Sequence, residues 1–119
     1  MADVNRGNRP LSPHLQVYRP QLTSMSSILV RITGIATLGT AVLIVAWLFA
    51  AAASPAAFDT MNGLLTSGLG KLLMLLATWA AFYHMLGRLR HVIWDFGYAL
   101  DVESSEKMAM GMIGLATIL

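Results

Sequence analysis

The longest uncharged run of the chain separates Arg31 from Asp59, and it constrains the fold more than any other feature. Residues 32–58 contain no Lys, Arg, Asp or Glu. A transmembrane helix needs about 20 predominantly apolar residues to cross the hydrocarbon core of a bilayer. The run exceeds that length, so it predicts a membrane-spanning helix over about residues 26–53.

The composition agrees with membrane insertion. Of the 119 residues, 56% are hydrophobic and 12% are charged, whereas soluble domains are about 25% charged. There are no cysteines, so the chain offers no thiolate to an iron–sulfur cluster and forms no disulfide. The few basic residues form no basic face, so the sequence predicts no nucleic-acid binding. We expect the whole chain, residues 1–119, to be a single membrane-anchor domain of an all-α membrane protein.

Two further helices are expected after the first. The second spans about residues 71–95 and ends among charged residues at the membrane surface. The third spans about residues 104–119, which is short for a bilayer at about 1.5 Å per residue, and we expect the protein to continue beyond it. Residues 54–70 are rich in Gly, Ser and Thr and predict a short loop with an amphipathic turn on the membrane surface. The polar segment 1–24 precedes the first helix.

The positions of Lys and Arg predict the orientation of three transmembrane helices. Four of the eight basic residues precede or open the first helix, one starts the second, and three lie from the end of the second helix to the start of the third. Cytoplasmic or matrix segments carry the excess of Lys and Arg, so the N-terminus is expected on that side and the C-terminus on the other. Residues 1–24 lack the arginine-rich pattern of a transit peptide, which favours a bacterial inner membrane over a mitochondrial inner membrane.

A row of polar side chains follows one face of the second helix. At about 100° per residue, four of them fall within about 60° of arc: His84, Arg88, His91 and Asp95. Arg90 must point away from this row. A neutral imidazole is a common axial ligand of haem iron, and a basic group nearer the surface can hold the haem propionates.

The two histidines of this row cannot both coordinate one iron. They stand on one face about 10 Å apart along the helix axis, whereas axial ligands approach a porphyrin from opposite sides. A second histidine ligand would therefore come from another chain. Residue type and spacing alone favour a simpler alternative, in which His84 donates to a backbone carbonyl of a neighbouring helix and His91 lies at the interface.

A second candidate site lies at the start of the first helix. Ser27 and Arg31 are four residues apart and share a helix face. A hydroxyl and a guanidinium near the lipid boundary can bind the carbonyl oxygens of a quinone and stabilise charge during its reduction. Spacing alone favours the alternative that Ser27 caps the helix and Arg31 is a surface anchor. A third segment, RPLSPHLQVY (9–18), has no periodic pattern and could be held by a soluble partner.

Three segments in this order resemble the cytochrome b membrane-anchor subunit of succinate dehydrogenase, respiratory complex II: RPLSPHLQVY (9–18), SSILVRITG (26–34) and HMLGRLRHVIWDFG (84–97). The resemblance implies that His84 is an axial ligand of a haem b shared with a second small membrane-anchor subunit, which supplies the other ligand. It also implies that His91 and Arg31 approach the haem propionates. Ser27 and Arg31 would line the ubiquinone pocket.

The resemblance further implies a non-autonomous subunit of a succinate:ubiquinone oxidoreductase within a hetero-oligomeric helical bundle. Succinate would be oxidised at the flavin of a flavoprotein subunit, and electrons would pass through the clusters of an iron–sulfur subunit to ubiquinone. This chain would hold no catalytic residue for succinate oxidation. One departure concerns Val30, where the family often has a histidine, so a role in haem binding attached to that position does not carry over.

Three alternatives remain open at this point. The anchor of a quinol:fumarate reductase belongs to the same family, and the direction of the reaction depends on the quinone and on the soluble subunits. A small structural membrane protein would use its polar residues only for helix packing. A transporter is disfavoured because the sequence has no internal repeat.

Overall fold

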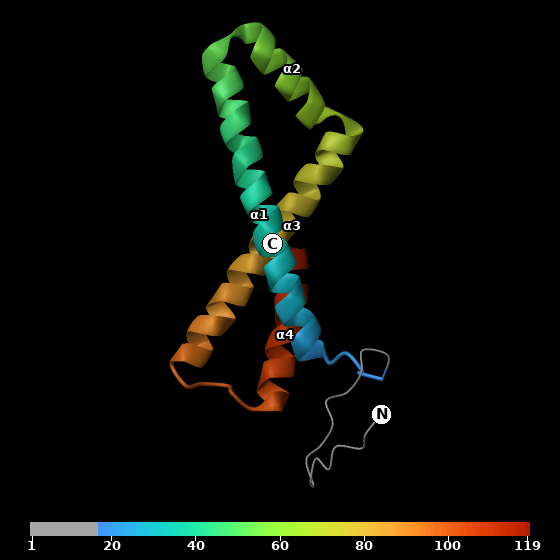
Figure 1. Cartoon of the computed structure of the whole chain (residues 1–119), viewed down its shortest axis with the longest axis vertical. Coiled ribbons are helices and arrows are strands. Elements are labelled where there is room, and N and C mark those ends of the chain that lie inside the picture. The colour runs from blue at the N-terminus through green and yellow to red at the C-terminus, as the bar shows by residue number, and fades with distance from the viewer. Residues whose placement is uncertain (1–16) are drawn as a thin grey trace, which may run out of the picture.

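The structure is a computed structural model that describes residues 17–119, and the regular secondary structure in that range consists of helices joined by short turns (Figure 1). It has four helices: α1 (Leu22–Ala53), α2 (Pro55–Thr66), α3 (Gly68–Asp95) and α4 (Val102–Ile118). Among the described residues, α1 and α3 are long and apolar enough to cross a membrane, and the 17-residue α4 is shorter. The all-α fold is confirmed, with two candidate spans.

Helix α1 begins four residues before the predicted start. Pro20 has no amide donor, and the backbone amide of Gln21 donates to Ser24 Oγ at 3.1 Å, while that hydroxyl donates to the Gln21 carbonyl at 2.8 Å. These local bonds satisfy groups that a helix start leaves without intrahelical partners. Ser24 therefore stabilises the helix start from within the first turn. Ser26, on the second turn, is buried.

The predicted loop between the first two long helices is wrong over residues 55–66, which form α2. Ser54 ends α1 and caps α2, because its Oγ accepts from the Ala57 amide at 3.2 Å, and Pro55 at the first helical position has the φ angle that a helix needs. Ser67 caps α3 in the same way, accepting from the Gly70 amide at 3.1 Å. Two serine caps thus build a helix where the small polar residues suggested a loop.

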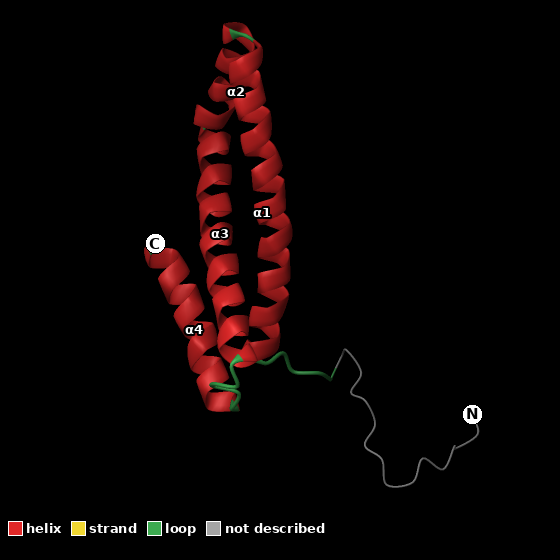
Figure 2. Cartoon of the chain, turned by 90° about the vertical axis from the view of Figure 1, so that its left-hand side faces the viewer, coloured by secondary structure: helices red, strands yellow, loops and turns green. Residues whose placement is uncertain are grey.

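The helices form an open, elongated bundle. Figures 1 and 2 show α1 and α3 crossing near their middle, with α2 joining their far ends and α4 beside the other half of α3. Small residues permit the close contacts. A Cβ at Gly70 would collide with the backbone of Leu64 and Leu65, and the core below the crossing is built by Val30, Tyr83, Met112 and Ala116.

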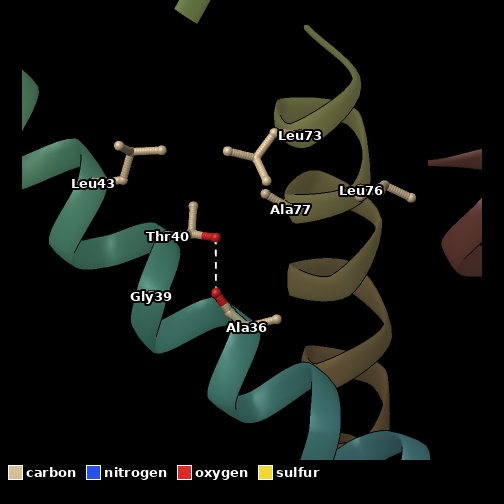
Figure 3. Close-up of a pocket in the computed structure, with 7 residues that line it drawn as sticks. All are labelled: Ala36, Gly39, Thr40, Leu43, Leu73, Leu76 and Ala77. Atoms are coloured by element: carbon tan, nitrogen blue, oxygen red, sulfur yellow. Dashed lines mark hydrogen bonds between the residues drawn. The ribbon is translucent and has the colours of Figure 1, made fainter. Parts of the chain in front are cut away.

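Much of the apolar surface of the two long helices stays exposed, including Ile35, Phe49 and Leu75. Lipid tails and partner helices are as apolar as these side chains, so a membrane bundle does not need to bury them within one chain. Above the crossing, α1 and α3 diverge around a cavity of about 430 Å³. Figure 3 shows Thr40 at this cavity, and its hydroxyl donates to the Ala36 carbonyl at 2.9 Å.

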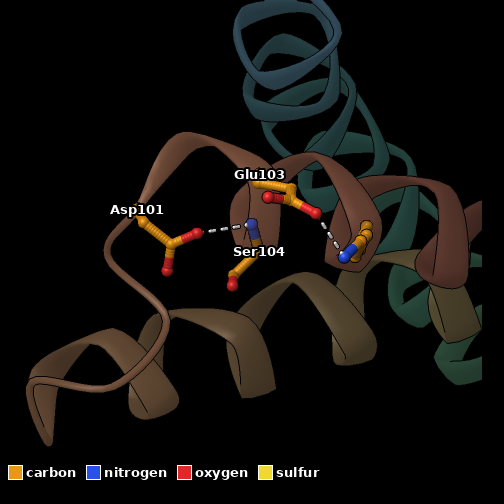
Figure 4. Close-up of polar contacts among 4 residues, drawn as sticks. Asp101, Glu103 and Ser104 are labelled. Atoms are coloured by element: carbon orange, nitrogen blue, oxygen red, sulfur yellow. Dashed lines mark hydrogen bonds and ion pairs between the residues drawn. The ribbon is translucent and has the colours of Figure 1, made fainter.

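The turn between α3 and α4 comprises residues 96–101 and lies outside the long helices. Asp101 caps α4, since its carboxylate accepts from the Ser104 amide at 2.8 Å, and Lys107 pairs with Glu103 at 2.7 Å (Figure 4). The Ser104 amide holds the pKa of the Asp101 carboxyl below its ordinary value. These contacts stabilise the first turns of α4.

Candidate functional site

His84 lies on α3 where that helix crosses α1. Its Nδ1 is 2.9 Å from the backbone carbonyl oxygen of Val30. A carbonyl oxygen only accepts, so this contact assigns the proton to Nδ1 and leaves the lone pair of Nε2 free. The side chain is half-buried, and within residues 17–119 Nε2 has no hydrogen-bond partner. The chain therefore presents one imidazole nitrogen, Nε2, to a ligand.

The ring of His84 rests against the backbone of α1 at Gly34. A Cβ at that position would lie 2.8 Å from Cε1 of the ring and 3.1 Å from Nδ1, but 3.7 Å from Nε2. The glycine thus leaves room for the side of the ring that faces α1. Nε2 is the ring nitrogen farther from this contact.

His91 lies two turns further along α3 and is also half-buried. Its Nδ1 is 2.7 Å from the carbonyl oxygen of Gly87, one turn earlier in the same helix, which again leaves Nε2 free. The Trp94 ring packs edge-on against the imidazole at 5.2 Å between centroids. Arg88 and Asp95 are exposed. The predicted row exists as a face, but among the described residues no hydrogen bond or ion pair joins its members.

Arg90 points into the bundle, away from the histidine row, as the helix repeat predicts. It is 2% exposed, its Nη1 donates to Ser26 Oγ at 2.8 Å, and its guanidinium carbon lies 4.6 Å from the ring centroid of Trp94. The fully buried Tyr83 donates to the Ser26 carbonyl at 3.5 Å. In the described part of the chain, Nε and Nη2 of Arg90 have no partner.

The sequence reasoning did not identify this polar cluster, which we define as Ser26, Tyr83, Arg90 and Trp94. A signal was present, because residues 83, 90 and 94 repeat at seven and four positions and so share a helix face. The helix repeat of α3 could not show which face of α1 packs against these three residues. The cluster ties the first turns of α1 to the end of α3.

Ser27 and Arg31 sit on α1 beside this cluster but face differently. Ser27 is half-buried and Arg31 is exposed, and neither side chain bonds to another part of residues 17–119. Val30 faces the interior instead, where it fills the space left by Gly87, because a Cβ at Gly87 would collide with the Val30 side chain. The segment 9–18 lies outside the described residues except for Val17 and Tyr18, so the structure says nothing of His14.

Within residues 17–119, no group of three or more metal-ligating side chains gathers. The arrangement instead offers single imidazole nitrogens at two depths of α3 and a hydroxyl with a guanidinium on α1. Such groups can complete the coordination of a metal already held in an organic ring and can hydrogen-bond a carbonyl ligand.

Comparison with known proteins identifies the family. Residues 5–119 match the family described as succinate dehydrogenase/fumarate reductase transmembrane subunit. The chain belongs to this family. A succinate dehydrogenase cytochrome b556 subunit from Paracoccus denitrificans is 48% identical over 119 residues, which cover 100% of this chain and 92% of the relative.

Two other relatives extend this likeness to more distant organisms. A cytochrome b560 subunit of succinate dehydrogenase from Reclinomonas americana is 39% identical over 118 residues, covering 92% of this chain and 79% of the relative. A cytochrome b556 subunit from Rickettsia conorii is 34% identical over 95 residues, covering 80% and 73%. The resemblance to succinate dehydrogenase cytochrome b subunits is therefore confirmed. It places the imidazoles of α3 in a family of transmembrane subunits whose relatives are named as cytochromes b.

Proposed function

We propose that this chain is a membrane anchor of a succinate:ubiquinone oxidoreductase and that His84 is an axial ligand of a haem b. The observation that carries the proposal is the contact between His84 Nδ1 and the Val30 carbonyl. Metal-ligating imidazoles almost always donate their other ring nitrogen to a carbonyl, carboxylate or water, which fixes the tautomer and raises the basicity of the ligating nitrogen. The same contact also satisfies the packing alternative, so a direct test is needed.

The donor set fits a haem. A porphyrin supplies four of the ligands of its iron, so a protein chain needs to add only one imidazole nitrogen on each side. The space at Gly34 admits the ring of His84, and Nε2 has no hydrogen-bond partner among residues 17–119. His91 and Arg31 are proposed to hold the propionates, and a second small membrane-anchor subunit to supply the other axial ligand. When bound, the haem supplies a one-electron carrier within the membrane.

Ser27 and Arg31 are proposed to bind the ubiquinone headgroup. Both lie in the first three turns of α1, and Arg31 is exposed on the surface of this chain, where a neighbouring subunit or a lipid-soluble ligand can reach it. The hydroxyl and the guanidinium donate to carbonyl oxygens of the ring, and the fixed positive charge stabilises negative charge that develops on oxygen during reduction. Succinate oxidation is assigned to partner subunits with flavin and iron–sulfur clusters.

The proposed topology has three spans, formed by α1, α3 and α4, with the N-terminus on the cytoplasmic side of a bacterial inner membrane. The Lys and Arg residues at the start of α1 and near the end of α3 support this orientation. Helix α4 covers about 25 Å at 1.5 Å per residue, which is somewhat less than the bilayer core of about 30 Å. The whole chain is proposed to act as one anchor domain.

A second candidate is the anchor of a quinol:fumarate reductase. The family description names both succinate dehydrogenase and fumarate reductase, so membership does not decide the direction of the reaction. The quinone that co-purifies with the complex separates the two functions. Ubiquinone supports the first proposal, and a low-potential quinone supports the second.

The haem assignment is tested by His84→Leu in the complete complex. We expect loss of the haem b absorbance and of bound haem, because leucine has no nitrogen ligand. Met85→Leu, an exposed neighbour on the same helix, is the matched control and should keep the wild-type spectrum. An unchanged spectrum and haem content in His84→Leu would contradict the assignment and leave the packing alternative.

A further inference from the structure

The contact between Gly34 and His84 distinguishes this glycine from the other glycine of α1. At Gly34, a Cβ would lie 2.8 Å from Cε1 of the His84 ring, closer than real Cβ contacts. At Gly39, five residues later, a Cβ would have nothing within 4 Å. The imidazole therefore occupies the space that a side chain at position 34 would take. At position 39, no atom of the described residues occupies the corresponding space.

The hydrogen bond of His84 depends on the same close approach. The carbonyl that accepts from Nδ1 belongs to Val30, four residues before Gly34, so it lies one helical turn away on the same face. The ring reaches this carbonyl because it lies flush with the α1 backbone at Gly34. A methyl group there would push the ring outward by moving Cε1 and Nδ1, the two atoms nearest to it.

Two constraints thus act on one ring. The glycine sets how closely the ring plane approaches α1, and the Val30 carbonyl sets the tautomer and the rotation of the ring. Both constraints come from α1, whereas the histidine itself is on α3. The orientation of the free Nε2 is therefore decided by the opposite helix.

We propose that Gly34 is a positioning residue for the haem ligand: it seats the His84 imidazole against α1 and makes the hydrogen bond to the Val30 carbonyl attainable. The inference rests on the proposed haem ligation by His84. Outer-shell partners of metal ligands typically change metal affinity by about 10- to 100-fold when they are altered. Gly34→Ala should act on the haem in this way without touching it.

The test compares Gly34→Ala with Gly39→Ala in the purified complete complex. For Gly34→Ala we expect haem to transfer to excess apomyoglobin about 10-fold faster than from wild type. We also expect altered g-values of the low-spin ferric haem in electron paramagnetic resonance and a shifted midpoint potential, because these depend on the orientation and basicity of the axial imidazole. Gly39→Ala should match wild type in all three. Wild-type haem transfer and g-values in Gly34→Ala would overturn the proposal.

The His84→Leu variant distinguishes failure of the Gly34 proposal from failure of the haem-ligand proposal. If His84→Leu loses the haem and Gly34→Ala behaves as wild type, only the role of Gly34 fails. If His84→Leu keeps the haem, the proposed ligand fails, and the role of Gly34 fails with it.

If the Gly34→Ala complex assembles poorly, a second measurement tests the proposal. The double variant Gly34→Ala/His84→Ala is then compared with His84→Ala by the amount of assembled complex. Equal amounts support a conflict between the added methyl group and the ring, because the methyl has no effect once the ring is gone. A further drop in the double variant overturns the proposal, since the damage would then come from another contact.

Discussion

The buried guanidinium of Arg90 allows a quantitative test of the packing between α1 and α3. Its Nη1 donates to Ser26 Oγ at 2.8 Å, and the group lies 4.6 Å from the Trp94 ring centroid. Its Nε and Nη2 have no partner among residues 17–119. Arg90→Met keeps a long unbranched side chain and removes the charge and all of the donors.

The gains and losses of Arg90→Met nearly cancel. The variant loses a hydrogen bond from a charged donor, about 1.5–3 kcal/mol, and a cation–π contact, about 0.5–2 kcal/mol. It also removes two buried donor nitrogens without partners, Nε and Nη2, which cost about 1–3 kcal/mol each. We therefore expect a change in stability of no more than about 1 kcal/mol, as when buried charges are replaced by apolar side chains of similar volume.

Arg90→Ala should behave very differently. It gives up the same interactions but also leaves a cavity where the side-chain stem packed, and truncating a long buried side chain to alanine costs about 2–5 kcal/mol. The assay is thermal unfolding of the purified complex at one scan rate, followed by intrinsic fluorescence. We expect the unfolding midpoint of Arg90→Met to equal that of wild type and the midpoint of Arg90→Ala to be clearly lower. Arg88→Met, at an exposed arginine of the same helix, is the control and should match wild type.

A low midpoint for Arg90→Met would refute this reasoning. If Arg90→Met fell as far as Arg90→Ala, then Nε and Nη2 would have partners in the assembled complex, such as a carboxylate of another subunit or an ordered water. Breaking a paired buried charge is strongly destabilising, by about 3–5 kcal/mol. The difference between the two variants therefore reports whether the charge is paired.

Two further substitutions test the packing and the quinone site. Gly87→Ala should destabilise the complex by about 1–3 kcal/mol through overpacking against Val30, and Val30→Ala in the same chain should recover most of the loss in unfolding midpoint; no recovery would place the conflict elsewhere. Arg31→Ala should impair ubiquinone reduction while succinate oxidation with an artificial acceptor persists. The surface cation variant Lys107→Ala should leave both activities intact, and undiminished ubiquinone reduction in Arg31→Ala would remove that residue from the pocket.

Local sequence patterns were sufficient for the long helices and for the faces of their side chains. The uncharged run after Arg31 predicted α1. The spacing of His84 and His91 predicted that both lie on one side of α3 and that Arg90 lies on another. These features follow from the helix repeat and from the length of apolar sequence, which are properties of one segment at a time. The family resemblance then supplied roles that spacing alone did not favour.

The connector shows where local patterns misled. Its glycines, serines and threonines predicted a loop, yet Ser54 and Ser67 act as caps and the intervening residues form α2. Helical propensity is a weak guide for so short a segment, and no residue of α2 is buried. The serine caps at its two ends therefore account for the helix.

The sequence by itself determined that the chain is a helical membrane protein and which side chains share a helix face. Only the tertiary structure decided which faces meet: Arg90 against Ser26, Val30 in the space at Gly87, and His84 against Gly34. A helix repeat fixes the direction of each side chain around its own axis, but the crossing of two helices is set by the packing of small and large residues from both. The position of the His84 imidazole against Gly34 therefore depends on the packing between α1 and α3.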